Sequence, residues 1–230
     1  MSCERYTSAI IVAAGGSTRM GSRISKQLIP LCGRPAIEYT IRAFQDCDMI
    51  DEIIVVARSQ DIDDIGHIAF SFKKVSTVIS GGVDRVGSVR RGLQAASRHA
   101  THYAIHDGAR PLITVDEICR VLEAAYEHDA ATLGTPVTDT VKVVSGEGAI
   151  LSTPDRSTLW TVQTPQVFAR DLFHSALDNV YMNNLSVTDD CAMAEAIGAS
   201  VYVVRGEYTN IKLTTPADIT LAQAILEKRK

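Results

Sequence analysis

The sequence lacks several features that would mark particular classes of protein. No apolar run approaches the roughly 20 residues that cross a bilayer, which excludes an integral membrane protein. Its five cysteines are scattered, with no C-x-x-C pair, so neither a disulfide framework nor a zinc site is indicated. Lys and Arg total 23 against 27 Asp and Glu, a net charge of −4, whereas a nonspecific nucleic-acid binder needs a basic surface. Residues 1–7 hold no signal-type apolar stretch, so we expect a cytoplasmic protein that binds neither nucleic acid nor membrane.

The composition is that of one globular domain, with 46% hydrophobic and 22% charged residues in a chain of 230. Short β-branched runs alternate with helical patterns. Strands are predicted over 8–14, 52–57, 75–80, 103–106, 131–136 and 200–205, and helices over 35–45, 84–98, 114–128 and from 215 onward. This alternation predicts a Rossmann-like α/β fold, a mostly parallel twisted sheet with helices on both faces. Ligands of such sheets bind beyond the carboxyl ends of the strands.

Residues 138–162 interrupt the alternation. Two β-branched or apolar stretches, 140–144 and 149–151, flank a glycine turn at 145–148 and predict a protruding β-hairpin arm. A lone hairpin is marginal in water, so this one should pack against something. A second subunit and an antiparallel edge extension of the same sheet are both open on spacing alone.

The loop after the first predicted strand reads AAGGSTRM over residues 13–20 and is followed by Lys26. Its small residues let backbone N–H groups approach an anion closely, Arg19 can donate two hydrogen bonds to phosphate, and Lys26 adds a point charge. The loop matches neither G-x-G-x-x-G nor G-x-x-x-x-G-K-[ST], which disfavours a dinucleotide-dependent oxidoreductase and a P-loop NTPase. The alternative is a plain glycine turn with solvated charges.

A second candidate element is IHDGARP at residues 105–111. Asp107 ends a predicted strand, where a carboxylate can hold a substrate hydroxyl or a metal ion, and Arg110 follows in the loop. The alternative is an Asp turn with Arg110 paired to a neighbouring acid. His106 should point to the opposite face of the sheet from Asp107, and we interpret it as structural.

The string IHDGARP resembles the signature of the 2-C-methyl-D-erythritol 4-phosphate cytidylyltransferase family. Other motifs of the family follow in unbroken order across nearly the whole chain: GGVDRVGS at 81–88, DT at 139–140, Arg156, TPQ at 164–166, TDD at 188–190 and NIK at 210–212. A close relative, ribitol-5-phosphate cytidylyltransferase, shares many of them. The chain departs from the family in having Val12 before the AAG and Val83 after the two glycines, where the family often has proline and an acid.

The resemblance implies a reaction that joins a sugar-alcohol phosphate to the α-phosphate of CTP and releases pyrophosphate. It implies that CTP is contacted by Ala13, Ala14, Gly15, Gly82 and Ser88. The implied acceptor site consists of Asp107, Gly108, Arg110, Thr140, Thr164 and Thr188. The implied catalytic cations are Arg19, Lys26, Arg156 and Lys212.

The resemblance also implies Mg²⁺ or another divalent cation, bound mainly by triphosphate oxygens, with Asp107 as the candidate protein ligand. It implies a homodimer in which the arm, residues 138–162 of a single domain 1–230, crosses so that Arg156 serves the partner's site. Simpler interpretations stay open for three residues. Thr188 could cap a helix, Lys212 could be a solvated edge-strand lysine, and Arg156 could pair with Asp155. Alternative functions are a ribitol-5-phosphate cytidylyltransferase, a sugar-1-phosphate nucleotidyltransferase and a non-catalytic nucleotide-binding module.

Overall fold

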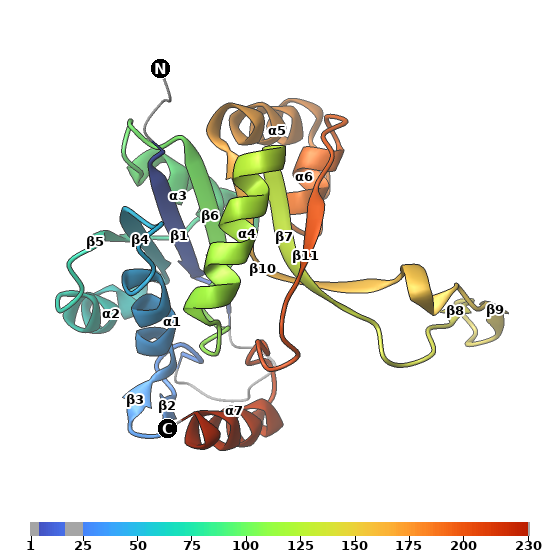
Figure 1. Ribbon diagram of the computed structural model, residues 1–230, viewed down its shortest axis with the longest axis horizontal. Helices are drawn as coiled ribbons and strands as arrows, with labels where there is room; N and C mark the ends of the chain where they lie inside the picture. The colour runs from blue at the N-terminus through green and yellow to red at the C-terminus, as the bar shows by residue number, and fades with distance from the viewer. Residues whose placement is uncertain (1–4, 17–24, 230) are drawn as a thin grey trace.

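The computed structural model describes residues 5–16 and 25–229, and Arg19 of the predicted phosphate loop lies outside these ranges. The described chain forms a seven-stranded sheet in the order β11-β7-β10-β6-β1-β4-β5 (Figure 1). Its strands are β1 (Thr7–Ala13), β4 (Glu52–Ala57), β5 (Val75–Ser80), β6 (His102–Asp107), β7 (Ala130–Pro136), β10 (Trp160–Ala169) and β11 (Tyr202–Arg205). Only β10 among them is antiparallel to its neighbours, β6 and β7. The predicted mostly parallel α/β fold is confirmed.

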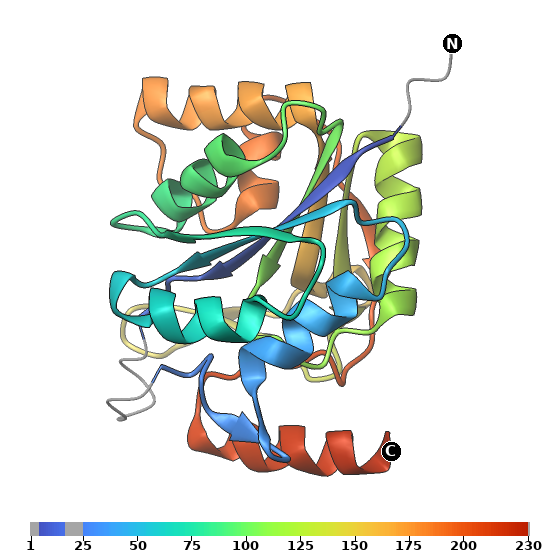
Figure 2. The same cartoon turned by 90° about the vertical axis from the view of Figure 1, so that its left-hand side faces the viewer.

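Helices cover both faces of the sheet, as Figure 2 shows. One layer consists of α1 (Ala36–Gln45), α2 (Ile62–Ala69) and α4 (Val115–His128), and the other of α3 (Arg85–Ala95), α5 (Arg170–Asn183) and α6 (Asp190–Glu195). Side chains of β1 alternate between the layers, since Ile11 packs in the first core and Ile10 in the second. A strand that is buried on both faces reads as a continuous apolar run, which is why β1 was evident from sequence. None of the described helices is long and apolar enough to cross a membrane.

Sequence analysis did not predict several elements, among them α2, β10, α5 and α6. The β10 sequence carries Gln163, Thr164 and Gln166 at buried positions together with a proline, so it lacks the apolar alternation expected of a strand. Those polar side chains are buried because they make hydrogen bonds to neighbouring strands and loops. The predicted helix over 84–98 ends earlier, at Ala95, because Ala96 adopts an extended conformation.

A third, smaller core lies below the sheet in Figure 1. There α7 (Pro216–Lys228) packs against β2 (Pro30–Leu31) and β3 (Arg34–Pro35) through Leu31, Leu213 and Ala222. Lys26 precedes β2 by a few residues and Lys212 directly precedes Leu213, so this core fixes the two segments that carry both lysines.

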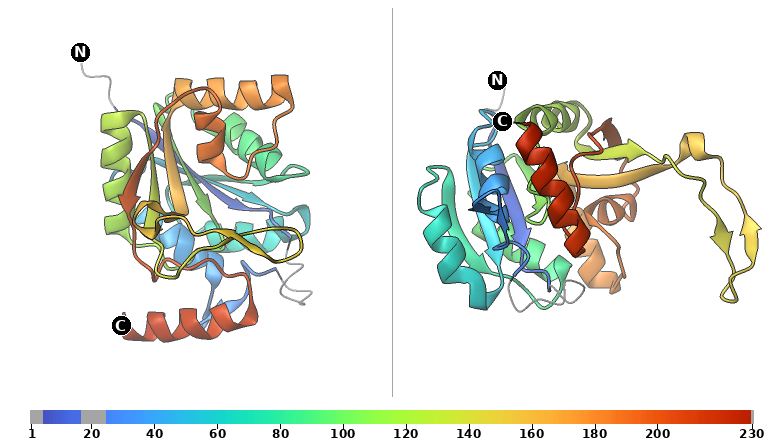
Figure 3. Two further views of the ribbon diagram at one scale, coloured as in Figure 1. Left: turned by 90° about the vertical axis from the view of Figure 1, so that its right-hand side faces the viewer. Right: turned by 90° about the horizontal axis from the view of Figure 1, so that it is seen from below.

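The predicted hairpin of the arm is present and separate from the central sheet, whereas residues 160–162 at the end of the predicted arm pair with β7 as the start of β10. Its strands β8 (Val143–Val144) and β9 (Ile150–Ser152) pair only with each other and are followed by the 3₁₀ turn η3 (Arg156–Thr158). Figures 1 and 3 show the arm projecting away from the body. An edge extension of the main sheet is therefore wrong for β8 and β9. Their apolar side chains are exposed in the single chain, Ile150 at 63% and Val144 at 54%.

Candidate active site

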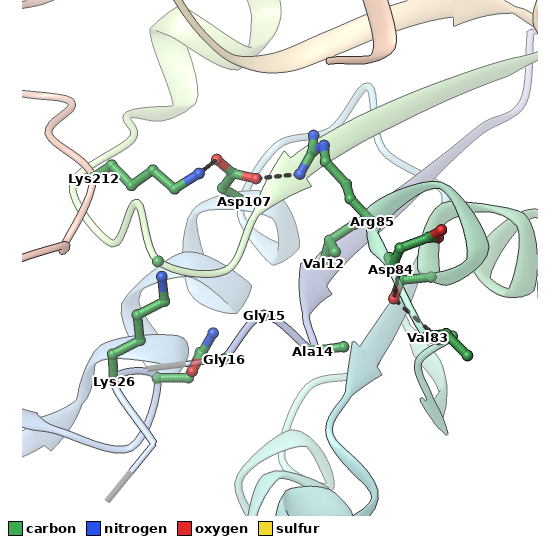
Figure 4. Close-up of a pocket in the computed structure, with 14 residues that line it drawn as sticks. Val12, Ala14, Gly15, Gly16, Lys26, Val83, Asp84, Arg85, Asp107 and Lys212 are labelled. Carbon is green, nitrogen blue, oxygen red and sulfur yellow. Dashed lines mark hydrogen bonds and ion pairs between the residues drawn. The ribbon is translucent and has the colours of Figure 1, made fainter. Parts of the chain in front are cut away.

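The carboxyl ends of β1 and β6 and the loop after β5 enclose a cavity of about 370 Å³ (Figure 4). This larger cavity is lined by Val12, Ala14, Gly15, Gly16, Lys26, Gln27, Gly82, Val83, Asp84, Arg85, Ser88, Asp107, Ala109 and Lys212. A smaller cavity of about 160 Å³ adjoins it and is lined by Arg85, Asp107, Arg110, Val162, Gln163, Thr164, Gln166, Thr188, Asp189 and Lys212. Three residues occur in both linings, and we call Arg85, Asp107 and Lys212 the shared wall.

The glycine-rich loop forms one side of the larger cavity. Of the three residues that the resemblance implies for CTP contact in this loop, Ala14 and Gly15 line the cavity, whereas Ala13 is fully buried in the core on the other side of β1. A methyl group added at Gly15 or Gly16 would meet nothing within 4 Å, so these residues present open backbone to the cavity. Lys26 extends from this side, opposite the helix that carries Arg85.

The loop before α3 forms the opposite side and is held by the Ser88 side chain. Ser88 Oγ accepts a hydrogen bond from the Gly82 N–H at 3.1 Å and donates one to the Asp84 carbonyl at 2.8 Å. A side chain at Gly82 would lie 2.5 Å from the Gly87 carbonyl carbon, so the tight approach of loop and helix requires glycine. The departing residue Val83 is fully exposed at the rim of the larger cavity.

The Asp107 carboxylate is the centre of the charge cluster. Its Oδ1 lies 2.6 Å from Arg85 Nη1, and its Oδ2 lies 2.6 Å from Lys212 Nζ and 3.9 Å from Arg110 Nε. Burial would raise the pKa of Asp107, but Arg85 and Lys212 outweigh that effect and hold the pKa well below its usual range. Asp107 is therefore an anion, and Lys212 pairs with it and lies outside any strand, so the interpretation of Lys212 as a solvated lysine on an edge strand is wrong.

His106 faces away from Asp107, as predicted, and packs 5.0 Å from the ring of Phe44. It is fully buried, with Nδ1 3.0 Å from Thr164 Oγ1 and Nε2 3.2 Å from the Arg110 carbonyl oxygen. Burial lowers the pKa of His106 to about 4, so it is neutral near pH 7. The same Thr164 hydroxyl accepts the Asp107 N–H at 3.0 Å, and His106 thus supports the strand end that presents Asp107.

The smaller cavity collects three more of the residues implied by the resemblance: Arg110, Thr164 and Thr188. Arg110 is fixed by a 2.7 Å hydrogen bond from Nη1 to the Asn210 carbonyl. Thr188 is not the cap of α6, because Asp189 is its N-cap and accepts the Ala192 N–H. Gly108 lines neither cavity and lies against Ile37 and Ala13 instead.

Two implied residues lie on the arm, outside both linings. Thr140 is exposed, and Arg156 Nη1 donates to the Thr138 carbonyl at 2.7 Å. Asp155 accepts from the Ser157 N–H and hydroxyl rather than from Arg156. Figure 1 shows why these residues do not meet the cavities of their own chain, since the arm points away from the body.

The donor set does not fit a metal ion held by protein ligands. No group of three or more His, Cys, Asp or Glu side chains converges among the residues that the structure describes. Both oxygens of Asp107, the candidate ligand, already contact cationic side chains at 2.6 Å. A metal cation there would be repelled by the positive charges of Arg85 and Lys212, which already lie against this carboxylate.

Sequence analysis assigned no role to Arg85, Asp190 or Gln166, although all three lie in motifs that it singled out. Arg85 bridges two carboxylates, with Nη2 2.6 Å from Asp190 Oδ2, and Gln166 Oε1 accepts the Asp190 and Cys191 N–H groups. The available signal was an arginine at the first position of a helix next to a binding loop. Its partners are 22 and 105 residues away, which spacing cannot show.

Comparison with known proteins identifies the family. A model of the family described as 2-C-methyl-D-erythritol 4-phosphate cytidylyltransferase matches residues 7–228. The chain belongs to this family. It is 42% identical to the enzyme of that name from Symbiobacterium thermophilum, covering 96% of this chain and 93% of that one. It is 40% identical to the one from Alkaliphilus oremlandii, with 97% and 96% covered.

Solved structures of the family share the fold. The crystal structure of 4-diphosphocytidyl-2C-methyl-D-erythritol synthase from Anaerococcus prevotii superposes with a TM-score of 0.88 at 32% identity, covering 97% of this chain and 99% of that one. The 2-C-methyl-D-erythritol 4-phosphate cytidylyltransferase of Thermus thermophilus gives a TM-score of 0.79 at 32% identity, with 95% and 98% covered. The similarity to these family members thus extends over nearly the whole of this chain and of each relative.

Proposed function

We infer that this chain is a cytidylyltransferase that transfers CMP from CTP to 2-C-methyl-D-erythritol 4-phosphate and releases pyrophosphate, a step in isoprenoid precursor biosynthesis. The observation that carries this inference is the pair of adjoining cavities with a charged shared wall. The larger cavity, beside the glycine-rich loop, accommodates the nucleotide. The smaller one accommodates the sugar-alcohol phosphate.

The proposed reaction requires compensation of negative charge more than it requires a general base. The attacking group is a phosphomonoester, whose second pKa is about 6, so it is largely a dianion at neutral pH. One of its oxygens attacks the α-phosphorus of CTP and the bond to the β-phosphate oxygen breaks, so that pyrophosphate leaves with the electron pair. Because two anions must meet, we propose that Arg19, Lys26, Arg156 and Lys212 offset the repulsion and hold the reactants in line.

We propose that Mg²⁺ or a similar cation arrives with the triphosphate, whose oxygens would supply most of its ligands. Each oxygen of Asp107 already pairs with a cationic side chain, Arg85 or Lys212, and this supports ligands from the triphosphate rather than from Asp107. When bound, the cation would neutralise part of the triphosphate charge.

We propose a homodimer in which each arm crosses to the partner. The exposed apolar side chains of β8 and β9 support this arrangement, since one isolated hairpin buries too little surface to be stable in water. Crossing would also bring Arg156 and Thr140 to the smaller cavity of the other subunit. Each active site would then draw residues from two chains.

We propose that the protein works in the cytoplasm. Cys32, Cys47, Cys119 and Cys191 are thiols, and the sulfurs of Cys47 and Cys119 lie only 3.6 Å apart without a bond. Unpaired thiols in such proximity suit a reducing compartment.

Pyrophosphate release tests the function. The purified protein is given CTP, UTP, ATP or GTP together with either 2-C-methyl-D-erythritol 4-phosphate or ribitol 5-phosphate. We expect release with CTP and the methylerythritol acceptor. Release with ribitol 5-phosphate alone would reassign the acceptor, and nucleotide binding without any release would indicate a non-catalytic binding module.

A further inference from the structure

Arg85 stands where the two cavities meet. It is the first residue of α3, directly after the loop that contains Gly82, and its side chain lines both cavities. The other members of the shared wall, Asp107 and Lys212, have roles in the proposed function. Arg85 has none, although it links the nucleotide side of the site to the acceptor side.

The guanidinium of Arg85 joins two carboxylates from different elements. Nη1 contacts Asp107 at the end of β6 and Nη2 contacts Asp190 at the start of α6, each at 2.6 Å. Figure 4 shows Arg85 and Lys212 reaching the Asp107 carboxylate from opposite sides. Because the guanidinium is planar and rigid, fixing one of its edges on Asp190 also fixes the edge that faces Asp107.

Asp190 is a firm anchor. Its side chain is fully buried, and among the residues that the structure describes only Arg85 bonds it, since Oδ1 has no partner. Its backbone is held in turn by Gln166 Oε1, which accepts the Asp190 N–H at 3.0 Å. A buried ion pair generally adds little net stability compared with an apolar pair of similar volume, so stability alone is a weak reason for this one.

We propose that Arg85, anchored by Asp190, is a positioning residue for the acceptor: it fixes the Asp107 carboxylate at the shared wall so that Asp107 meets an acceptor hydroxyl in a defined orientation. This role rests on the proposed function, in which Asp107 contacts the acceptor. A carboxylate has about four lone-pair positions, so Asp107 can accept a hydroxyl while Arg85 and Lys212 stay bonded. Arg85 does not itself need to touch either substrate.

The test is a comparison of acceptor kinetics with nucleotide affinity in Arg85→Lys. Lysine retains the charge but cannot bridge Asp107 and Asp190 with a rigid fork. We expect kcat/KM for 2-C-methyl-D-erythritol 4-phosphate to fall about 10- to 100-fold, the effect of one lost charge-assisted hydrogen bond. The dissociation constant of CTP, measured by calorimetry, should stay unchanged. The matched control is Arg90→Lys on the same helix, where Arg90 stacks over the Tyr181 ring and lines neither cavity.

Two further variants separate positioning from a purely structural role. Asp190→Asn keeps the size of the anchor but replaces the carboxylate that holds Arg85 with an amide, and it should reproduce the selective loss of acceptor efficiency even if Arg85→Lys folds poorly. In an Asp107→Asn background, Arg85→Lys should cost little more, because both changes act through one carboxylate.

Three outcomes overturn the proposal. They are wild-type acceptor efficiency in both Arg85→Lys and Asp190→Asn, additive losses with Asp107→Asn, or a parallel fall in CTP affinity, acceptor efficiency and melting temperature. Pyrophosphate release by the wild-type protein distinguishes these outcomes from a failure of the proposed function. Acceptor-dependent pyrophosphate release in wild type with unaffected variants removes the positioning role alone, whereas no release in wild type removes the function and the role together.

Discussion

At the scale of the residue, the main feature of the candidate site is that charged side chains contact one another where little solvent reaches them. Asp107 is a buried anion that contacts Arg85 and Lys212 at 2.6 Å, and both cations come from segments remote in sequence. The negative charge of Asp107 offsets part of the positive charge of these two side chains. Lys26 lines the larger cavity on the far side from Arg85 and adds positive charge where the triphosphate is expected.

Lys26→Ala is expected to lower turnover far more than it weakens acceptor binding, because a cation at the developing charge acts mainly in the transition state. The loss should be roughly 2.7–4 kcal/mol of barrier, by analogy with single oxyanion-hole donors, or about 100- to 1000-fold in kcat. A coupled pyrophosphate assay measures it. Lys228→Ala, at the exposed end of α7, serves as the control and should retain wild-type turnover. Near-normal turnover in Lys26→Ala would refute the role.

His106 makes stability depend on pH. Its pKa lies near 4 in the folded protein, against about 6.5 in an unfolded chain, so the unfolded state binds the extra proton between these values. The stabilisation is complete above pH 6.5 and is lost as the pH falls toward 4, by about 3 kcal/mol for this group. Urea unfolding across that range should show the decline, and His106→Gln should flatten it. His99→Gln, the same substitution at an exposed histidine, is the matched control.

At the scale of the element, α4 shows how local sequence fixes a structure that the site then uses. Thr114 and Glu117 form a capping box at its N-terminus, and Glu117 Oε1 also accepts the Glu207 N–H at 2.8 Å. This second bond ties the helix to the chain that leads on to Asn210 and Lys212. The capping box is local and could be predicted from the sequence. The hydrogen bond between Glu117 and Glu207 joins residues 90 positions apart, so the spacing of residues could not predict it.

Thr114→Ala is expected to lower the free energy of unfolding by about 1 kcal/mol, the usual cost of losing an N-cap hydroxyl. Because Thr114 lines neither cavity, kcat should stay at the wild-type value. Chemical denaturation and pyrophosphate release together check this. The matched control is Thr220→Ala on the exposed face of α7, where no cap is lost and stability should not fall. An unchanged stability in Thr114→Ala would show that the box contributes nothing.

At the scale of the whole molecule, the single chain is incomplete if its function is as proposed. Its body holds Lys26, Asp107 and Lys212 around the two cavities, whereas its arm carries Arg156 and Thr140 away from them (Figures 1 and 3). Crossed arms would restore the full set twice in one dimer.

Mixed dimers provide the test. Lys26→Ala and Arg156→Ala subunits, each strongly impaired alone, should recover partial activity when they are unfolded together and refolded, because one site of the mixed dimer then has an intact body and an intact arm. A mixture of Lys26→Ala with Lys212→Ala should stay inactive, since both changes fall in the body. If a verified mixed dimer of the first pair shows no recovery, the site is built from one chain.

The sequence predicts features that depend on neighbouring residues, whereas features that depend on distant residues become visible only in the structure. The strands β1, β4 and β5 and the box of α4 follow from apolar runs and capping residues, which act over a few positions. The strand β10 does not follow, because its buried polar residues Gln163 and Gln166 are explained only by partners elsewhere in the fold. Among the site residues, motif order indicated Asp107 and Lys212, but not that they contact one another.

The sequence by itself determined the α/β class, the family and the residue types available for chemistry, since each depends on local pattern or on motifs read in order. Only the tertiary structure decided that Arg85 bridges Asp107 and Asp190, that Asp189 rather than Thr188 caps α6, and that β8 and β9 leave the central sheet. The physical reason is that ion pairs and strand pairing act through space between distant segments. Their energies depend on distance and burial, which residue order does not encode directly.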